Sequence, residues 1–437
     1  MDMLILLLAI VLFTVLAFKG VSAIIMGPLV GLIVALLARL PVAETMFGPF
    51  MDSTSGYVQK YFFIFFLGAV FGAIYEETGA AKSIALGILK LSKGKMTASI
   101  ITIITGILTL GGISGFVAFF VVYPIAEQLF RENNVSRRLI PGAISAGTWT
   151  FSMIAPISPS IQNVIASKTL GTPIQAAATV GYIVTVFELV AIIVWLEWRT
   201  MRFTRKKIGF YEKGITPLPE RDMTNAMNDD DLPNFFLAIV PLLVIVLTFN
   251  LFPDIFLVET SVFLGVVLSI IFFGKRLPGE GLNKVFAPLN VGGLNGVSAI
   301  MNTALVVGFG GVVQNTSGFH HLVDTVLSWE MSPYLFVAIA VAICAGAVGS
   351  ASGGLTIAFD ALKDTFINMG VNLEYVHRIG VVAAGTLDTL PHQGAQITLL
   401  NLCHLTHREG YLDIAVTQII IPIIGVLIMI PLASMGI

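Results

Sequence analysis

Residues 380–407 have the sequence GVVAAGTLDTLPHQGAQITLLNLCHLTH, a hydrophobic segment that polar residues interrupt at its centre. A lipid-facing helix does not tolerate ionisable and hydrogen-bonding groups at this density. Pro391 lacks an amide hydrogen and clashes with the preceding turn, so a helix must bend or end there and leave backbone groups available to a ligand. Because broken helices at mid-membrane hold substrates and ions in secondary transporters, the segment predicts such a site. The alternative is a kinked helix whose polar groups satisfy one another.

The composition excludes a water-soluble protein. Of the 437 residues, 56% are hydrophobic and only 11% are charged, which leaves too little polar surface to face water. The apolar runs are about 15 to 25 residues long and lack strand-like alternation, which favours membrane-spanning helices. No basic residue precedes the first run, so we expect it to be retained as a span. The sequence predicts an all-α polytopic membrane protein in which Cys344 and Cys403 are free, buried thiols.

Hydrophobic patterning predicts two similar sets of spans. In the first half they are expected at 2–18, 21–41, 58–76, 80–92, 96–110, 114–130, 140–168 with an interruption, and 175–197. In the second half they are expected at 235–252, 258–274, 297–313, 334–349, 353–362, 379–403 and 413–434. A polar linker with a basic cluster separates the two sets.

Landmarks that contain glycine recur between the halves. Gly27 matches Gly265, the ETG at 77–79 matches the TSG at 316–318, Gly111 matches Gly349, and the AGT at 146–148 matches the AGT at 384–386. All four pairs are displaced by 238 or 239 residues, which indicates an internal repeat. We therefore expect a first repeat at 1–200, a cytoplasmic linker at 201–231 and a second repeat at 232–437.

The distribution of basic residues predicts the orientation of the repeats, since cytoplasmic loops are rich in lysine and arginine. With the linker inside and an odd number of crossings per half, 19 of the 24 basic residues fall on the cytoplasmic side. Both termini then face outward and the two repeats have inverted topology. The basic residues expected outside are Arg39, Lys60, Lys168, Lys363 and Arg378.

The first half contains a break of its own, after the AGT. Pro156 and Pro159 are too close together for an ordinary helix to continue through them. Backbone groups and hydroxyls in such a break could hydrogen-bond to a carboxylate without adding a charge. The alternative is a kinked helix whose polar groups hydrogen-bond to neighbouring helices. The candidate substrate ligands here are Ser158, Ser160, Gln162 and Asn163.

A turn rich in glycine and serine precedes each break, at 111–115 in the first half and at 349–354 in the second. Two short apolar arms joined by such a turn are typical of a hairpin that enters the membrane without crossing it. Helix N-termini at the tip of a hairpin attract anions. Ser350 and Ser352 are therefore candidate ligands, with close helix packing through small residues as the alternative.

Titratable groups at membrane depth are the candidates for coupling transport to a cation. Asp388 and His392 lie in the second break, and Glu188 lies within the span at 175–197 with no basic residue nearby in the sequence. Buried carboxyl groups and histidines are the side chains that exchange protons at such depth. His404 and His407, in contrast, are expected at the membrane interface.

These residues carry a resemblance to a known family. The chain resembles the gluconate permease family of gluconate:proton symporters, within the ion transporter superfamily, through nearly its whole length. The LDTLPHQGA at 387–395 and the LTHRE at 405–409 look most like the branch of 3-hydroxybutyrate permeases. Gluconate carriers have a different polar sequence at this break, and a histidine and an extra proline where this chain has Ile157 and Ser158. The resemblance implies uptake of a small hydroxy-monocarboxylate with a cation, by an elevator-like or rocking movement around two hairpins and two broken helices.

With this resemblance, we expect a secondary active transporter of the cytoplasmic membrane that takes up a small hydroxy-monocarboxylate by cation symport, with a proton as the favoured cation. The substrate ligands expected in the second half are Ser350, Ser352, Thr386, His392 and Gln393. The alternatives are a sodium-coupled di- or tricarboxylate carrier, an antiporter and, more distantly, an intramembrane enzyme. We expect no cofactor, metal or nucleic acid to bind. Relatives in the superfamily are often dimers, so a homodimer is one expected assembly.

Overall fold

The computed structural model describes residues 2–110, 115–158, 160–218, 232–252, 255–281, 283–327 and 331–437, and every regular element in them is a helix. The first half contains α1 (Asp2–Phe18), α2 (Ala23–Leu37), α3 (Val42–Thr45), the π-helix η1 (Met46–Phe50), α4 (Met51–Glu77), α5 (Ala80–Ser92), α6 (Thr97–Leu110), α7 (Gly115–Glu132), α8 (Leu139–Trp149), α9 (Phe151–Ile154), α10 (Ile161–Leu170) and α11 (Ala178–Arg205). The second half contains α13 (Phe235–Leu251), α14 (Val258–Phe273), the 3₁₀-helix η3 (Gly274–Arg276), α15 (Asn283–Gln314), α16 (Ser317–Leu327), α17 (Pro333–Val348), α18 (Ala351–Asn368), α19 (Leu373–Leu387), α20 (Gly394–Leu402), α21 (His407–Ala415), the π-helix η4 (Val416–Ile420) and α22 (Ile421–Ser434).

Five helical segments among the described residues are long and apolar enough to cross a membrane. They are residues 42–77, 178–205, 258–276, 283–314 and 407–434, and α5 with α6, bent by 117°, adds a sixth if the pair forms one span. Shorter apolar helices, which include α1, α2 and α17, accompany them. The predicted all-α polytopic membrane fold is confirmed.

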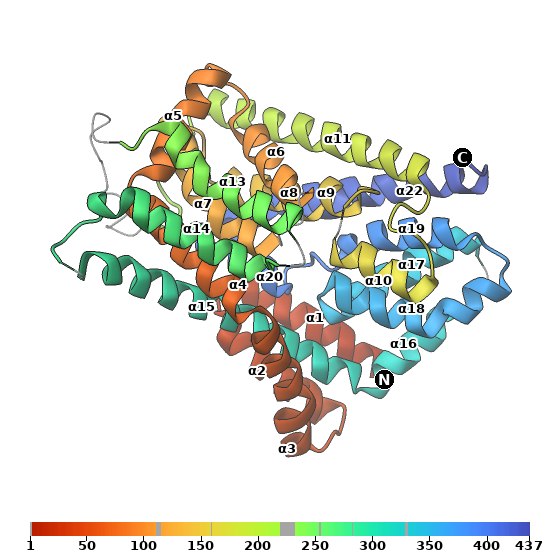
Figure 1. The fold of residues 1–437 in the computed structure, drawn as a ribbon. Coiled ribbons are helices and arrows are strands. Elements are labelled where there is room, and N and C mark those ends of the chain that lie inside the picture. The colour runs from red at the N-terminus through yellow and green to blue at the C-terminus, as the bar shows by residue number, and fades with distance from the viewer. Residues whose placement is uncertain are drawn as a thin grey trace.

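The long helices α4 and α15 run side by side through the molecule (Figure 1). They approach closely because glycines face the partner backbone: a Cβ on Gly292 would lie 2.6 Å from the Cα atom of Val70, and one on Gly296 would lie 2.8 Å from the Cα atom of Phe66. Small residues permit this close approach of helices in membranes. Helices α11 and α22 lie together along one side, while α10, α17, α18 and α19 gather at one end (Figure 1).

Helix ends fall at the breaks and turns that the sequence predicts. Helix α4 ends at the ETG, where Gly79 adopts a φ of 72°, and α17 ends at Gly349, which has a φ of 69°. Glycine adopts this left-handed conformation without the strain that a Cβ would cause. Both breaks are present, between α9 and α10 and between α19 and α20. The first-half turn at 111–114, Pro159 and residues 219–231 of the linker lie outside the described residues.

The order of helices also repeats along the chain. With the offset of 238 residues, α6, α7 and α8 fall on α17, α18 and α19. The homology of the halves and their inverted orientation stay predictions.

Some boundaries and loop assignments differ from those expected. Helix α15 begins at Asn283 rather than near 297, and α11 continues past the expected end at 197 to Arg205. Arg199, which was counted with the basic residues of the linker, lies within α11 and forms an ion pair of 2.7 Å with Asp413. Arg378, expected in an external loop, is fully buried in α19. These side chains find partners inside the bundle, which a count of loop charges does not take into account.

Candidate functional site

A cavity of about 100 Å³ lies where the second-half break, the second-half hairpin tip and the first-half break come together. Five of the predicted site residues line it: Gln162, Ser350, Ser352, Asp388 and Gln393. The other lining residues are Tyr57, Tyr61, Phe116, Trp149, Met153, Thr303, Val307, Gly349, Ala351, Gly385, Gly394 and Ala395. Both halves of the chain therefore contribute to one small polar cavity, which we call the central cavity.

The second-half break places Asp388 on the wall of the central cavity. Helix α19 ends at Leu387 and α20 begins only at Gly394, so the side chains between them are released from helical packing. The Asp388 carboxylate is 5% exposed. It accepts hydrogen bonds from Thr389 Oγ1 at 3.1 Å and from Gln393 Nε2 at 3.0 Å. A buried carboxylate held by neutral donors alone is costly, which marks Asp388 as a functional candidate.

The second-half hairpin tip faces this carboxylate. Ser350 caps α18 by accepting a hydrogen bond from the Gly353 amide at 3.2 Å. Ala351, in the first turn of α18, lines the central cavity together with Asp388. Helix N-termini favour negative charge, so the carboxylate of Asp388 sits at an anion-favouring position.

His392 packs against α17, although it lies in the same break as Asp388. Its Nε2 atom donates to the Gly346 carbonyl at 3.0 Å, since a carbonyl only accepts. Its Nδ1 atom is buried and has no partner among the described residues. The ring also contacts Phe13 of α1, with centroids 6.0 Å apart. His392 therefore holds the break against α17 and does not line the central cavity.

Three predicted residues in the first-half break have local roles or lie away from the cavity. Ser160 caps α10, donates to the Met153 carbonyl at 2.8 Å and accepts from the Asn163 amide. The Asn163 side chain donates to three backbone carbonyls in the break and accepts from Arg378. Ser158 is fully buried, and its hydroxyl has no partner among the described residues.

Two further predicted residues lie outside the central cavity. Thr386 is buried and donates to the Ala383 carbonyl at 2.6 Å, within its own helix. Glu188 is fully buried where α11 packs against α22, and a Cβ on Gly425 would lie 3.1 Å from its Oε1 atom. Neither carboxyl oxygen of Glu188 has a hydrogen-bond partner in the described part of the chain.

The position of His407 differs from the one predicted. It was expected at the interface, but it is 7% exposed and donates from Nε2 to the Pro391 carbonyl at 2.9 Å. Tyr411, one turn later on α21, donates to the Thr389 carbonyl at 2.7 Å. The proline break leaves these two carbonyls without helical partners, and α21 supplies donors for both.

Several residues of the site were not predicted from the sequence. Tyr57, Tyr61 and Trp149 form an aromatic wall of the central cavity, and nothing in the sequence distinguishes them from core aromatics. Gln418 accepts from Gln396 Nε2 at 2.8 Å, and its Oε1 atom lies 3.3 Å from the Thr389 hydroxyl that also contacts Asp388, which extends the network of Asp388. Gln418 lies in η4, and π-helical turns are frequent at functional sites. In the sequence, Gln418 could have been recognised as an isolated glutamine in the apolar run after residue 413.

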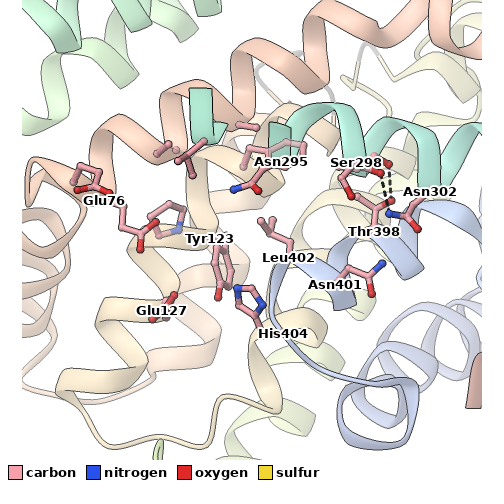
Figure 2. Close-up of a pocket in the computed structure, with 18 residues that line it drawn as sticks. Glu76, Tyr123, Glu127, Asn295, Ser298, Asn302, Thr398, Asn401, Leu402 and His404 are labelled. Atoms are coloured by element: carbon pink, nitrogen blue, oxygen red, sulfur yellow. Dashed lines mark hydrogen bonds between the residues drawn. The ribbon is translucent and has the colours of Figure 1, made fainter. Parts of the chain in front are cut away.

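A second cavity, of about 320 Å³, lies between α4, α7, α15 and α20 (Figure 2). We call it the acidic cavity because Glu76, Glu77 and Glu127 line it. Asn302 and Thr398 lie at its other end, away from Glu76 (Figure 2). The sequence did not predict this cavity, because its acidic residues come from helices far apart in the chain.

The two cavities adjoin at α15 and α20. Thr303 lines the central cavity and Thr398 lines the acidic cavity. Gly394 permits the contact, since a Cβ there would lie 2.9 Å from the Cα atom of Thr303. Within the described residues, no group of three histidine, cysteine, aspartate or glutamate side chains is placed to hold a metal ion.

A helical membrane fold with a broken helix and a buried polar cavity defines a polytopic membrane transporter. The chain is 34% identical to the uncharacterized transporter YxjC of Bacillus subtilis over 96% of each chain. It is 23% identical to an uncharacterized transporter of Haemophilus influenzae, over 74% of this chain and 73% of that one. The chain belongs to the same transporter family as YxjC.

No family model matches the chain. Among solved structures, the YdaH transporter of Alcanivorax borkumensis is similar with a TM-score of 0.43 and 12% identity, over 90% of this chain and 88% of that one.

Proposed function

We propose that this transporter takes up a small hydroxy-monocarboxylate, of the 3-hydroxybutyrate or gluconate kind, by symport with a proton across the cytoplasmic membrane. The observation that carries the proposal is the central cavity, where Asp388 meets the N-terminus of α18 together with Ser352, Gln393 and Gln162. Such a cavity offers a carboxylate uncharged donors and places one ionisable group beside it. The resemblance to the gluconate permease family supports the class of substrate.

The proposed site divides the substrate between two walls. The α18 N-terminus with Ser350 and Ser352 provides hydroxyl and amide groups for the carboxylate. The aromatic wall of Tyr57, Tyr61 and Trp149 is suited to a short aliphatic chain. The volume of about 100 Å³ favours a substrate of a few carbons over a sugar acid.

Asp388 is the proposed coupling residue because it lines the same cavity as the proposed substrate ligands. His392 and Glu188 are the second and third candidates, and both lie outside the cavity lining. Intramembrane ionisable residues of this kind commonly relay protons in transporters.

Transport by proteoliposomes tests the proposal. Labelled 3-hydroxybutyrate and gluconate are offered in turn with an imposed proton gradient, a sodium gradient or neither. We expect accumulation of 3-hydroxybutyrate with the proton gradient alone.

Asp388→Asn should remain in the membrane and lose accumulation. The matched control is Asp360→Asn, which changes an exposed aspartate on α18 and should leave uptake unchanged. Full accumulation by Asp388→Asn would contradict the role of Asp388.

Accumulation driven by sodium alone would favour a sodium-coupled di- or tricarboxylate carrier, and stimulation by substrate on the opposite side would favour an antiporter. An intramembrane enzyme remains a more distant alternative, and turnover of a substrate without any gradient would identify it. A homodimer is proposed as the assembly only from the resemblance.

A further inference from the structure

Asp388 supplies a negative charge at the place where α18 attracts an anion. Helix α18 has 18 residues, so its N-terminus carries a substantial partial positive charge. Ser350, Ala351 and Ser352 at this N-terminus line the central cavity together with Asp388, and Gln393 Nε2 donates to the Asp388 carboxyl group at 3.0 Å. The Gln393 amide group and the α18 N-terminus, which suit a substrate carboxylate, thus already lie at a carboxylate of the protein itself.

Two buried polar atoms on the wall of the same cavity have no partner among the described residues. They are the hydroxyl of Tyr57 and the Oε1 atom of Gln393, and the Gln393 side chain belongs to a residue that is 8% exposed. Unsatisfied buried polar groups are rare in native proteins and commonly mark a ligand site. A tyrosine hydroxyl is suited to donate to a carboxylate, and the amide oxygen is suited to accept from a substrate hydroxyl.

We propose, on the basis of the carboxylate transport proposed above, that ionised Asp388 and the substrate carboxylate compete for the Gln393 amide group and for the α18 N-terminus. The substrate then binds only after Asp388 has taken up a proton. Two carboxylates that share one small site cannot both be ionised, because their repulsion is strong in a buried environment. Protonation of Asp388 removes its negative charge from the α18 N-terminus and frees the Gln393 amide group for the incoming anion.

This competition makes symport obligatory. One proton binds to a carboxyl oxygen of Asp388 for each substrate carboxylate that binds. When that proton leaves on the other side of the membrane, ionised Asp388 takes back its donors and displaces the substrate. A carrier with this site does not bind the anion without the proton, so the anion cannot leak through alone.

The other titratable groups around Asp388 are few. Tyr57 and Tyr61 face the cavity from α4, and Tyr411 approaches from α21. Tyrosine hydroxyls stay neutral at the pH values of the test. Two histidines remain among the described residues of the break and its neighbours: His392 donates to the Gly346 carbonyl of α17, and His407 of α21 donates to the Pro391 carbonyl. His392→Gln therefore separates a histidine contribution from that of Asp388.

Equilibrium binding to the purified, full-length protein in detergent tests the competition. Trp149 lines the central cavity, so its fluorescence reports binding there. The Trp149→Phe variant shows which part of the fluorescence change comes from Trp149. The probe is 3-hydroxybutyrate, titrated between about pH 5.5 and 8.5, where a simple carboxylate stays ionised. We expect the affinity of the wild-type protein to fall about tenfold per pH unit above the titration of Asp388. A dye in weakly buffered solution should report one proton taken up per carboxylate bound.

Asp388→Asn should bind 3-hydroxybutyrate with an affinity that does not change with pH, and without proton uptake. His392→Gln should keep the pH slope of the wild-type protein, whatever its affinity. Wild-type binding without pH dependence and without proton uptake would overturn the competition, as would an Asp388→Asn variant that keeps the wild-type slope. Loss of that slope in His392→Gln would also overturn it. If 3-hydroxybutyrate, gluconate and succinate all fail to bind at any pH, with or without sodium, the proposed function itself fails.

Discussion

The hydroxyl groups of Thr303 and Thr398 lie 2.7 Å apart and hydrogen-bond between α15 and α20. Thr303 lines the central cavity and Thr398 lines the acidic cavity, so this hydrogen bond forms part of the wall between the two. Opening the wall would connect the proposed substrate site with a larger cavity that holds three glutamates.

Thr303→Val removes one hydroxyl and keeps the shape of the side chain. A hydrogen bond between helices in a membrane contributes about 0.6 kcal/mol, so we expect roughly a threefold increase in the population with an open wall. The measurement is the rate at which a charged thiol reagent modifies Ser352→Cys, since the native Cys344 and Cys403 are buried. Thr204→Val, on the exposed face of α11, is the control. An unchanged rate in Thr303→Val would show that this hydrogen bond does not limit access.

The hairpin arms α17 and α18 touch through their backbones at Gly354. A Cβ on Gly354 would lie 2.1 Å from the Cα atom of Ala345. Gly354→Ala must therefore separate the arms, which we expect to cost about 1–3 kcal/mol and to lower the thermal midpoint in detergent. It should also weaken 3-hydroxybutyrate binding, because the hairpin tip moves.

The control is Gly56→Ala, at an exposed position of α4 with no atom within 4 Å of the added Cβ. Because alanine favours the helix over glycine, this variant should be equal to the wild-type protein or up to about 1 kcal/mol more stable. Equal thermal midpoints for both variants would contradict the close contact of the arms.

The sequence predicts the positions of the breaks and of the second-half turn because single residues determine them. Pro391 ends a helix wherever it lies, and Gly349 is where a left-handed φ is tolerated. Asp388, Ser352 and Gln162 line one cavity, which is in keeping with broken helices that place polar groups at one depth. The partners of His407 were not predictable in the same way, because a donor 16 residues away from Pro391 depends on how α21 packs.

Arg378 shows a further limit of prediction from sequence. Its guanidinium donates to the Ile154, Ile174 and Ala176 carbonyls at 2.7–3.0 Å and to Asn163 Oδ1 at 2.7 Å. These acceptors lie more than 200 residues earlier in the chain. An arginine between a polar turn and an apolar run is typical of a membrane interface, so only the fold reveals that it is buried.

Arg378→Ala leaves these buried carbonyls without donors, which we expect to cost about 3 kcal/mol or more. Arg378→Lys should fall between the alanine variant and the wild-type protein, because an ammonium group does not reproduce the planar fork of a guanidinium. The thermal midpoint in detergent measures both effects, with Arg408→Ala at an exposed position of α21 as the control. A wild-type midpoint in Arg378→Ala would show that this network does not stabilise the first-half break.

Glu188 places a carboxyl group between α11 and α22 with neither oxygen hydrogen-bonded in the described part of the chain. An ionised group there would carry a large desolvation cost, whereas a neutral carboxyl costs far less. Glu188→Gln is neutral and similar in shape, so we expect it to keep the thermal midpoint of the wild-type protein. We also expect it to keep proton-driven accumulation, because no described hydrogen bond connects Glu188 to Asp388.

Glu188→Ala should be less stable by about 2 kcal/mol, since it leaves a cavity beside Gly425. Loss of accumulation in a stable Glu188→Gln that still binds 3-hydroxybutyrate would instead move the coupling proton from Asp388 to Glu188.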